Sequence, residues 1–185
     1  MERIEGFLFS PSKTFDASKK DTIGDAFNYY VVILVITAVL AIVAAVPFLL
    51  PAWMAALPKA PPLAAMVWLV PVAILVVALV GGIVCAFILG LWLHLWVYLV
   101  GGRKGLDQTL KAVMYGATPN LLLLGVAPIW AIIVVIIGVK QLHALPAGRA
   151  ALAVILALIC ATIIVAITSG LFLLHFLIAR FGRPI

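Results

Sequence analysis

The chain has 185 residues, of which 67% are hydrophobic and 10% are charged, and its formal net charge is +6. A soluble domain carries about a quarter charged residues, so this composition excludes a water-facing surface and predicts one integral membrane domain. The positive charge favours anionic lipid head groups, and no basic stripe alternates with aromatic residues as nucleic-acid binding would require. We therefore expect an all-α, multi-pass protein of the cell membrane without a nucleic-acid partner.

Residues 1–26 form a hydrophilic leader, which we separate from a polytopic membrane domain at 27–185. The leader holds five of the six acidic residues and four of the twelve basic ones. Thr22 and Asp25 match a capping box directly before the first apolar run, which predicts a helix start there. The aromatic residues of the leader predict short interfacial helices whose rings rest in the head-group layer, namely Phe7, Phe9 and Phe15.

The first two apolar runs predict two long membrane-spanning helices. The first covers about 27–50, and Pro47 and Pro51 are expected to bend or end it. The second covers about 66–100 and, as one helix, would extend roughly 50 Å. Because a bilayer core needs only about 20 helical residues, this helix must tilt, project or break at Gly81-Gly82. We expect one long helix.

The remaining apolar sequence leaves the number of crossings open. Residues 106–139 suffice for two short crossings with a break near 125–128, or for one crossing plus a surface helix. A last span is expected at about 150–178. The positive-inside rule places the amino terminus in the cytoplasm, because nine basic residues then lie inside and three outside. The count is the same for four and for five spans, so charge alone does not separate them.

Small residues recur every four positions along the second span. They are Ala78, Gly82, Ala86 and Gly90. Such a stripe makes a shallow groove in which the backbone of another helix can approach closely. Because the last span carries a similar stripe, we expect these two helices to pack together, or one of them to pair with a second copy of the chain.

The sequence contains no pattern that predicts an enzyme. No catalytic residue, cofactor-binding loop or metal-ligand pair is apparent, and the first, second and last spans contain no Asp, Glu, Lys or Arg. His94 and His175 lie in apolar runs, where a proton carrier or a metal ligand is one reading. We favour the other reading, a histidine near the interface that bonds to a neighbouring helix, because no second ligand follows at helical spacing.

A helix breaker stands inside the third apolar region, in the stretch "MYGATPN" (114–120). Pro119 removes a backbone donor and pushes against the carbonyl of Tyr115, and Gly116 leaves space beside it. The side chains of Thr118 and Asn120 are suited to bonding the freed carbonyl groups. Such a break persists in lipid only where neighbouring helices cover it, so this motif is expected to face the bundle interior as a structural kink.

Three stretches together resemble the Yip (Ypt-interacting protein) family in its prokaryotic form. They are "FLFSPSKTF" (7–15), "GGRKGLDQTLKAVMYGATP" (101–119) and 128–156. The most specific parts are the Gly-Gly-x-x-Gly loop that runs into Tyr-Gly-x-x-Pro, and the run with Gly138, His143 and Leu145. The resemblance implies five helices, a cytosolic amino terminus and an outside carboxyl terminus. Eukaryotic members act in vesicle traffic with Rab-type GTPases, but their Asp-Leu-Tyr-Gly-Pro element is missing here, so GTPase binding is not carried over.

These observations favour a non-enzymatic scaffold that organises the membrane or binds a protein partner in the membrane or the cytosol. Such a scaffold would present a basic cytosolic face to anionic lipid or to a partner. We expect this face to consist of the leader with Arg103, Lys104, Lys111, Lys140 and Arg149. The alternative is a small transporter or lipid-handling carrier with a polar passage near Pro119. A mid-membrane cavity lined by Tyr115, Thr118, Asn120 and a histidine would favour the carrier, and a filled bundle would favour the scaffold.

Overall fold

The computed structural model describes residues 2–56 and 69–181, and these ranges contain helices and connections but no β-strand. Three described helices are long and apolar enough to cross a membrane, namely α3 (Ile23–Ala56), α5 (Leu69–Leu99) and α9 (Ala147–Phe181). The expected all-α membrane protein is confirmed, whereas five crossings are not established by these helices. The connection predicted between the first two spans begins at Pro51, but residues 51–56 still belong to α3. The rest of it, with Lys59, lies outside the described residues, as does Arg183.

Helix α3 continues through Pro47 and Pro51, although the sequence predicted a bend or an end there. Each proline removes one backbone donor. Because the two prolines are four residues apart, the missing hydrogen bonds lie on the same side of the helix, and the bonds on the other sides remain. Helix α5 also continues through Gly81-Gly82, which confirms the single long helix that was expected.

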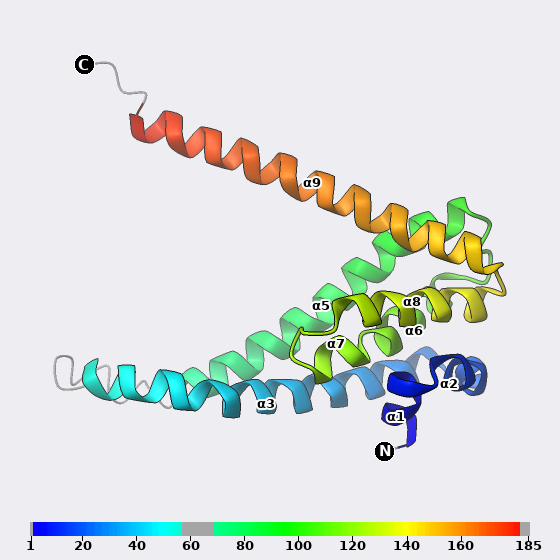
Figure 1. The fold of residues 1–185 in the computed structure, drawn as a ribbon, viewed down its shortest axis with the longest axis horizontal. Coiled ribbons are helices and arrows are strands. Elements are labelled where there is room, and N and C mark those ends of the chain that lie inside the picture. Colours follow the sequence, from blue (N-terminus) through cyan, green and yellow to red (C-terminus); the bar gives the residue numbers. More distant parts are fainter. Residues whose placement is uncertain (1, 57–68, 182–185) are drawn as a thin grey trace.

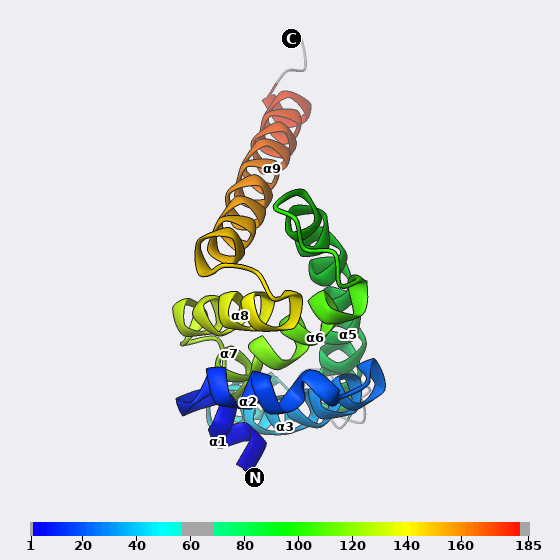
Figure 2. The same ribbon diagram turned by 90° about the vertical axis from the view of Figure 1, so that its right-hand side faces the viewer.

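The third apolar region forms a helical hairpin. Helices α6 (Leu106–Gly116) and α7 (Thr118–Leu122) lead into a turn, and α8 (Pro128–His143) returns beside α6. The turn contains Leu124 at φ 49° and Gly125 at φ 85°, at the start of the break near 125–128 that one of the two readings of this region expected. Helix α6 packs on both α3 and α5, which also contact each other, and α8 packs on α6 and on α9 (Figure 1; Figure 2).

The leader is helical and packs on the hairpin. It consists of α1 (Glu2–Phe9), α2 (Pro11–Ala17) and the 3-10 turn η1 (Ser18–Lys20). The capping box at the start of α3 is confirmed, because the Thr22 amide donates to Asp25 Oδ2 at 2.8 Å and the Asp25 amide donates to Thr22 Oγ1 at 3.2 Å. Helix α2 packs against α8, and α1 packs against α7.

The polar elements gather at one end of the molecule, which we call the leader end. The leader, the start of α3, the connection 101–105 and the corner 144–146 all lie on this side of the molecule, on the right of Figure 1. At the other end α9 points away from α3 and α5 (Figure 1), and it is exposed from Thr162 to Arg180. Such a wide apolar surface is suited to contact with acyl chains.

Candidate functional site

The side chain of Tyr115, in the family motif, is fully buried beneath the leader. The ring of Phe7 stacks on it, with centroids 4.7 Å apart and planes inclined by 17°. Phe15 and Tyr29 meet the same ring edge-on, at 6.2 Å and 5.2 Å. Phe7 and Phe15 are therefore core residues, and the expectation that they rest in the head-group layer is wrong; only Phe9 is largely exposed. The reason is that α6 offers an apolar ring face to the leader, and such ring pairs add stability beyond the area that they bury.

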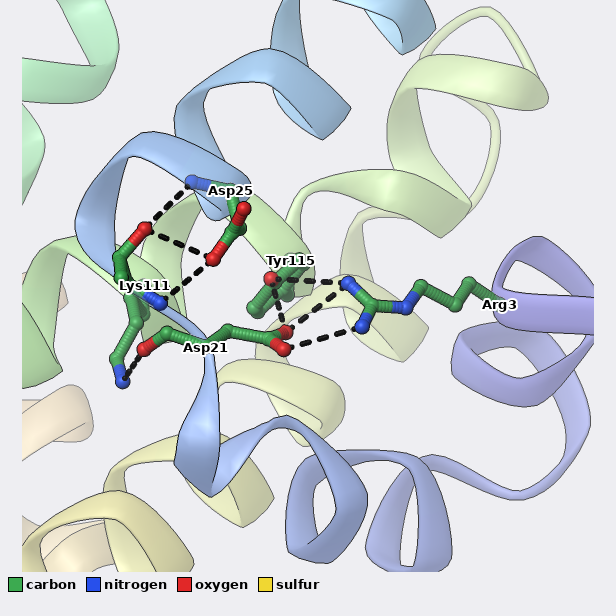
Figure 3. A network of polar contacts seen from close by, with 6 residues as sticks. Arg3, Asp21, Asp25, Lys111 and Tyr115 are labelled. Atoms are coloured by element: carbon green, nitrogen blue, oxygen red, sulfur yellow. Dashed lines mark hydrogen bonds and ion pairs between the residues drawn. The ribbon is translucent and has the colours of Figure 1, made fainter.

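Asp21 joins the leader to the motif through a network of polar contacts (Figure 3). The Tyr115 hydroxyl donates to Asp21 Oδ2 at 2.6 Å. The guanidinium of Arg3 donates to both carboxylate oxygens of Asp21 at 3.0 Å, and this hydrogen bonding raises the pKa of Arg3. The ammonium of Lys111 donates to the backbone oxygen of Asp21 at 2.9 Å. Hydrogen bonds with a charged donor or acceptor are stronger than those between neutral groups. These contacts therefore hold α1 and α6 against the start of α3.

Lys111 does not lie on an exposed basic face, in contrast to the expectation from the sequence. Its side chain is 2% exposed and is directed at Asp21. Lys111 and Tyr115 are four residues apart in α6, so they share the side of that helix which meets the leader. A buried charge needs hydrogen-bond partners, and the turn before α3 supplies one.

The helix break is buried and closed by local hydrogen bonds. Pro119 is among the fully buried side chains, as its expected interior position requires. Thr118 Oγ1 donates to the freed carbonyl of Tyr115 at 2.7 Å, and the hydroxyl of Tyr29 contacts Thr118 Oγ1 at 3.1 Å. The bond expected from Asn120 to a freed carbonyl group is not observed, and its side-chain oxygen is buried without a hydrogen-bond partner.

Gly116 allows α6 and α8 to pack closely, which differs from its expected role beside Pro119. A methyl group at Gly116 would overlap the side chain of Val135 and lie 3.1 Å from its Cα atom. Gly138 acts in the same way on α8, because a methyl group there would lie 2.6 Å from the ring of Phe15. Both family glycines are thus explained by close packing around the leader and the hairpin.

The small residues of α5 face α3 and α6 rather than the last span. A methyl group at Gly82 would lie 2.8 Å from Leu34 of α3, and one at Gly90 would overlap Leu110 of α6. Ala86 between them is buried, whereas Ala78 is half-buried. The stripe therefore acts inside one chain.

Helix α9 packs on α5 through other residues. The indole of Trp92 donates to the backbone oxygen of Ala157 at 2.9 Å. Ala153 and Ala157 are buried at this contact, so the expected proximity of the two helices is observed for the first half of α9 only.

Thr109 bridges two histidines at the leader end. Its hydroxyl lies 2.8 Å from His94 Nδ1 and 2.9 Å from His143 Nε2, and so links α5, α6 and α8. His94 thus bonds to a neighbouring helix, as expected, while His175 lies in the exposed part of α9. Among the described residues, no third Cys, His, Asp or Glu joins the pair in a group that could hold a metal ion. This pair was not predictable from the sequence, because its members are 49 residues apart.

Four of the five predicted basic residues are exposed, namely Arg103, Lys104, Lys140 and Arg149. Two segments that carry them meet, since a methyl group at Gly101 would lie 3.7 Å from Arg149 Nη1. The guanidinium of Arg103 lies 3.7 Å from the ring centroid of Tyr98. The leader adds the exposed Lys13, Lys19 and Lys20. We call the four exposed side chains with these three lysines the basic face. Acidic residues of the leader lie at the same end, and basic residues remain in excess there.

Comparison with known proteins finds one match, to a family model. No curated protein and no solved structure matches the chain. The family model of the Yip1 domain matches residues 6–170, which include most of the leader, the hairpin and the motif around Tyr115. This match covers most of the chain and confirms the resemblance seen in the sequence. The chain is a multi-pass membrane protein that belongs to the Yip1 domain family.

Proposed function

We propose that this protein is a non-enzymatic scaffold of the cell membrane, which organises the membrane or holds a protein partner at its basic face. The observation that carries the proposal is the internal use of the motif's polar groups. Tyr115 and Thr118 are hydrogen-bonded to Asp21 and to the broken helix, and the leader covers them. These groups stabilise the fold, so the charged side chains exposed at the leader end, among which basic residues are in excess, remain for contact with lipid or a partner.

The competing proposal, a carrier, required a cavity lined jointly by Tyr115, Thr118, Asn120 and a histidine. A hollow beside the break is lined by Asn120, whereas Tyr115 and Thr118 are buried and do not line it. His94 and His143 bond to Thr109 at the leader end. This separation favours the scaffold over the carrier.

We further propose a cytoplasmic leader and five crossings, two of them made by α6–α7 and by α8. The proximity of Gly101 to Arg149 supports this arrangement, because four crossings would put these connections on opposite sides of the membrane. Helix α8 has 16 residues and is about 24 Å long, which suits a short crossing inside a bundle. The excess of basic residues at the leader end supports its cytoplasmic side.

The basic face is tested by its attraction to anionic membranes. The full chain is held in nanodiscs, and the capture of phosphatidylserine vesicles and of phosphatidylcholine vesicles is measured. Changing Arg103, Lys104, Lys140 and Arg149 together to Gln should weaken capture of the anionic vesicles about tenfold or more. High salt should weaken capture by the unmodified chain.

The matched control changes Arg103 and Arg149 to Lys, which keeps the charge and should keep the capture. Unchanged capture by the Gln variant, or equal capture of both vesicle types by the unmodified chain, would exclude a role of this face in binding anionic membranes. Elution of each variant as a single species shows that the comparison concerns folded protein.

A further inference from the structure

A hollow of about 460 Å³ opens between α1 and the first part of α3, and we call it the α1–α3 hollow. Three consecutive residues of α1 and one side of α3 line it, namely Glu2, Arg3, Ile4, Tyr29, Val32 and Ile33. Its volume lies within the range of about 300–1,000 Å³ that is typical of sites for small molecules. Unlike the hollow beside the helix break, it is lined by charged and by apolar side chains together.

Two opposite charges line the α1–α3 hollow, and both are exposed. The guanidinium of Arg3 reaches Asp21, and the Arg3 side chain is 50% exposed (Figure 3). Its Nη1 and Nη2 atoms donate to Asp21, whereas no described group accepts a hydrogen bond from its Nε. Glu2 is exposed, and no described residue forms an ion pair with its carboxylate. A ligand in the hollow can therefore reach one cationic and one anionic side chain.

The hollow is polar toward the leader end and apolar toward the hydrocarbon. The guanidinium of Arg3 lies beside Asp21, which precedes α3, whereas Val32 lies inside the apolar window of α3. From Val32 an exposed apolar stripe continues at helical spacing, and it consists of Val32, Ile36, Val39 and Val43. The stripe is about 16 Å long, which is about half the thickness of the hydrocarbon core. It therefore suits one acyl chain of a lipid in the leaflet next to the leader end.

The two charges restrict the head group of that lipid. Arg3 suits a phosphate, and Glu2 suits a cation. An anionic lipid such as phosphatidylglycerol would place its phosphate near Glu2 without a cation of its own to offset the repulsion. Phosphatidylcholine and phosphatidylethanolamine carry both charges, but only the primary ammonium of phosphatidylethanolamine has N–H groups that can donate to a carboxylate.

We propose that the α1–α3 hollow binds one molecule of phosphatidylethanolamine. Its phosphate accepts a hydrogen bond from Arg3, its ammonium donates to Glu2, and one acyl chain lies along the stripe that begins at Val32. The lipid thereby holds α1 against α3. This inference goes beyond the scaffold function. Because Glu2 and Arg3 do not belong to the basic face, it stands or fails independently of the vesicle test.

The test uses the full chain in detergent micelles and a phosphatidylethanolamine that carries a photoreactive group in one acyl chain. Crosslinked peptides are identified by mass spectrometry and should map to residues 32–43. Two competitors share their acyl chains and differ only in the ammonium, namely dioleoylphosphatidylethanolamine and dioleoylphosphatidylcholine. Because the choline group has no N–H, phosphatidylcholine should compete about fivefold less well or worse. Dioleoylphosphatidylglycerol should also compete less well, because it has no cation.

A pair of matched variants completes the test. Glu2→Gln removes the negative charge and should reduce the advantage of phosphatidylethanolamine over phosphatidylcholine to about twofold or less. Glu5→Gln makes the same change on the same helix and should leave the advantage unchanged, because Glu5 is exposed but does not line the hollow. Glu2 has no ion pair with a described residue, so its replacement is expected to leave the fold intact. Elution of both variants as single species checks this.

Three results would overturn the proposal. The first is crosslinking spread evenly over exposed helices such as α9, which indicates surrounding bulk lipid. The second is competition by phosphatidylcholine or phosphatidylglycerol that equals competition by phosphatidylethanolamine. The third is an undiminished advantage of phosphatidylethanolamine in folded Glu2→Gln protein.

Discussion

Asp21 is the residue that connects the leader to the family motif. It accepts hydrogen bonds from Arg3 and Tyr115 through its carboxylate, and from Lys111 through its backbone oxygen. Its side chain lies in a turn, so no periodicity in the sequence indicates its partners. At the residue scale, the hydroxyl of Tyr115 is thus a fastening point of the leader, and the ring beneath it belongs to the core.

Tyr115→Phe keeps the stacked ring and removes only the hydrogen bond to Asp21. We expect a loss of about 1–2 kcal/mol in the free energy of unfolding, since the bond is made to a charged group that keeps Arg3 as a partner. The measurement is thermal unfolding in detergent, followed by tryptophan fluorescence. Tyr98→Phe is the control, because Tyr98 is half exposed and the phenylalanine ring still faces Arg103. Equal unfolding midpoints for both variants would contradict the role of Asp21.

At the scale of elements, glycines decide how closely the helices approach. Gly82 and Gly90 bring α5 against α3 and α6, and Gly116 brings α6 against α8. The hydroxyl of Tyr30 adds a hydrogen bond to the backbone oxygen of Gly82 at 3.0 Å. Close contact of helix backbones is a main source of packing energy in membranes, so these positions stabilise the fold of a single chain.

Neighbouring glycines of α5 offer a matched comparison. Gly82→Leu forces a side chain into Leu34 and should destabilise the fold by about 1–3 kcal/mol. Gly81→Leu meets open space, because nothing lies within 4 Å of a methyl group there, and should leave stability unchanged or higher. Thermal unfolding and size-exclusion chromatography in detergent measure both. Equal unfolding midpoints for the two variants, with a smaller elution size for Gly82→Leu alone, would contradict this role. The small residues of α5 would then mediate association between copies of the chain.

At the scale of the molecule, the polar leader end lies opposite an apolar end, where α9 points away from α3 and α5. The basic face, the two connections and the leader occupy one end, and the outer half of α9 is exposed along its length. A molecule built this way presents one aqueous face to partners and a wide surface to lipid. The crossing number then depends on whether the turn of the hairpin emerges on the far side.

Labelling of a single cysteine at Val126 tests this arrangement. Val126 lies in the hairpin turn and is 82% exposed. In a chain with Cys85 and Cys160 changed to Ala, five crossings predict that Val126→Cys reacts with an impermeant maleimide only from the side opposite the leader. Lys104→Cys should react only from the leader side. Reaction of Val126→Cys from the leader side, or from neither side, would reduce the crossings to the three long helices.

The order of helices follows from the sequence to a large extent. The hydrophobic runs predicted α3, α5 and α9, and the break near Gly125 predicted the hairpin turn. The capping box was predictable because its two partners, Thr22 and Asp25, lie within one helical turn. Local spacing carries this information, since a bond between near neighbours needs no knowledge of the fold.

The polar network and the true partner of the α5 stripe were not predictable in this way. Arg3 and Tyr115 are 112 residues apart, and a stripe of small residues specifies that some helix approaches without specifying which one. The aromatic residues of the leader also suit a lipid interface and a protein core equally well, so their composition could not decide between these environments.

The sequence by itself determined that the chain is an all-α membrane protein, because so few charged side chains cannot cover a water-facing surface. It also indicated where the helix of the family motif breaks, because Pro119 lacks a backbone donor and stands with Gly116, Thr118 and Asn120 within about one helical turn, whereas Pro47 and Pro51 did not end α3. Only the tertiary structure decided what covers that break. The leader, α3 and α8 meet around Tyr115 through contacts between distant residues, and the energy of such contacts depends on which surfaces are brought together rather than on local spacing.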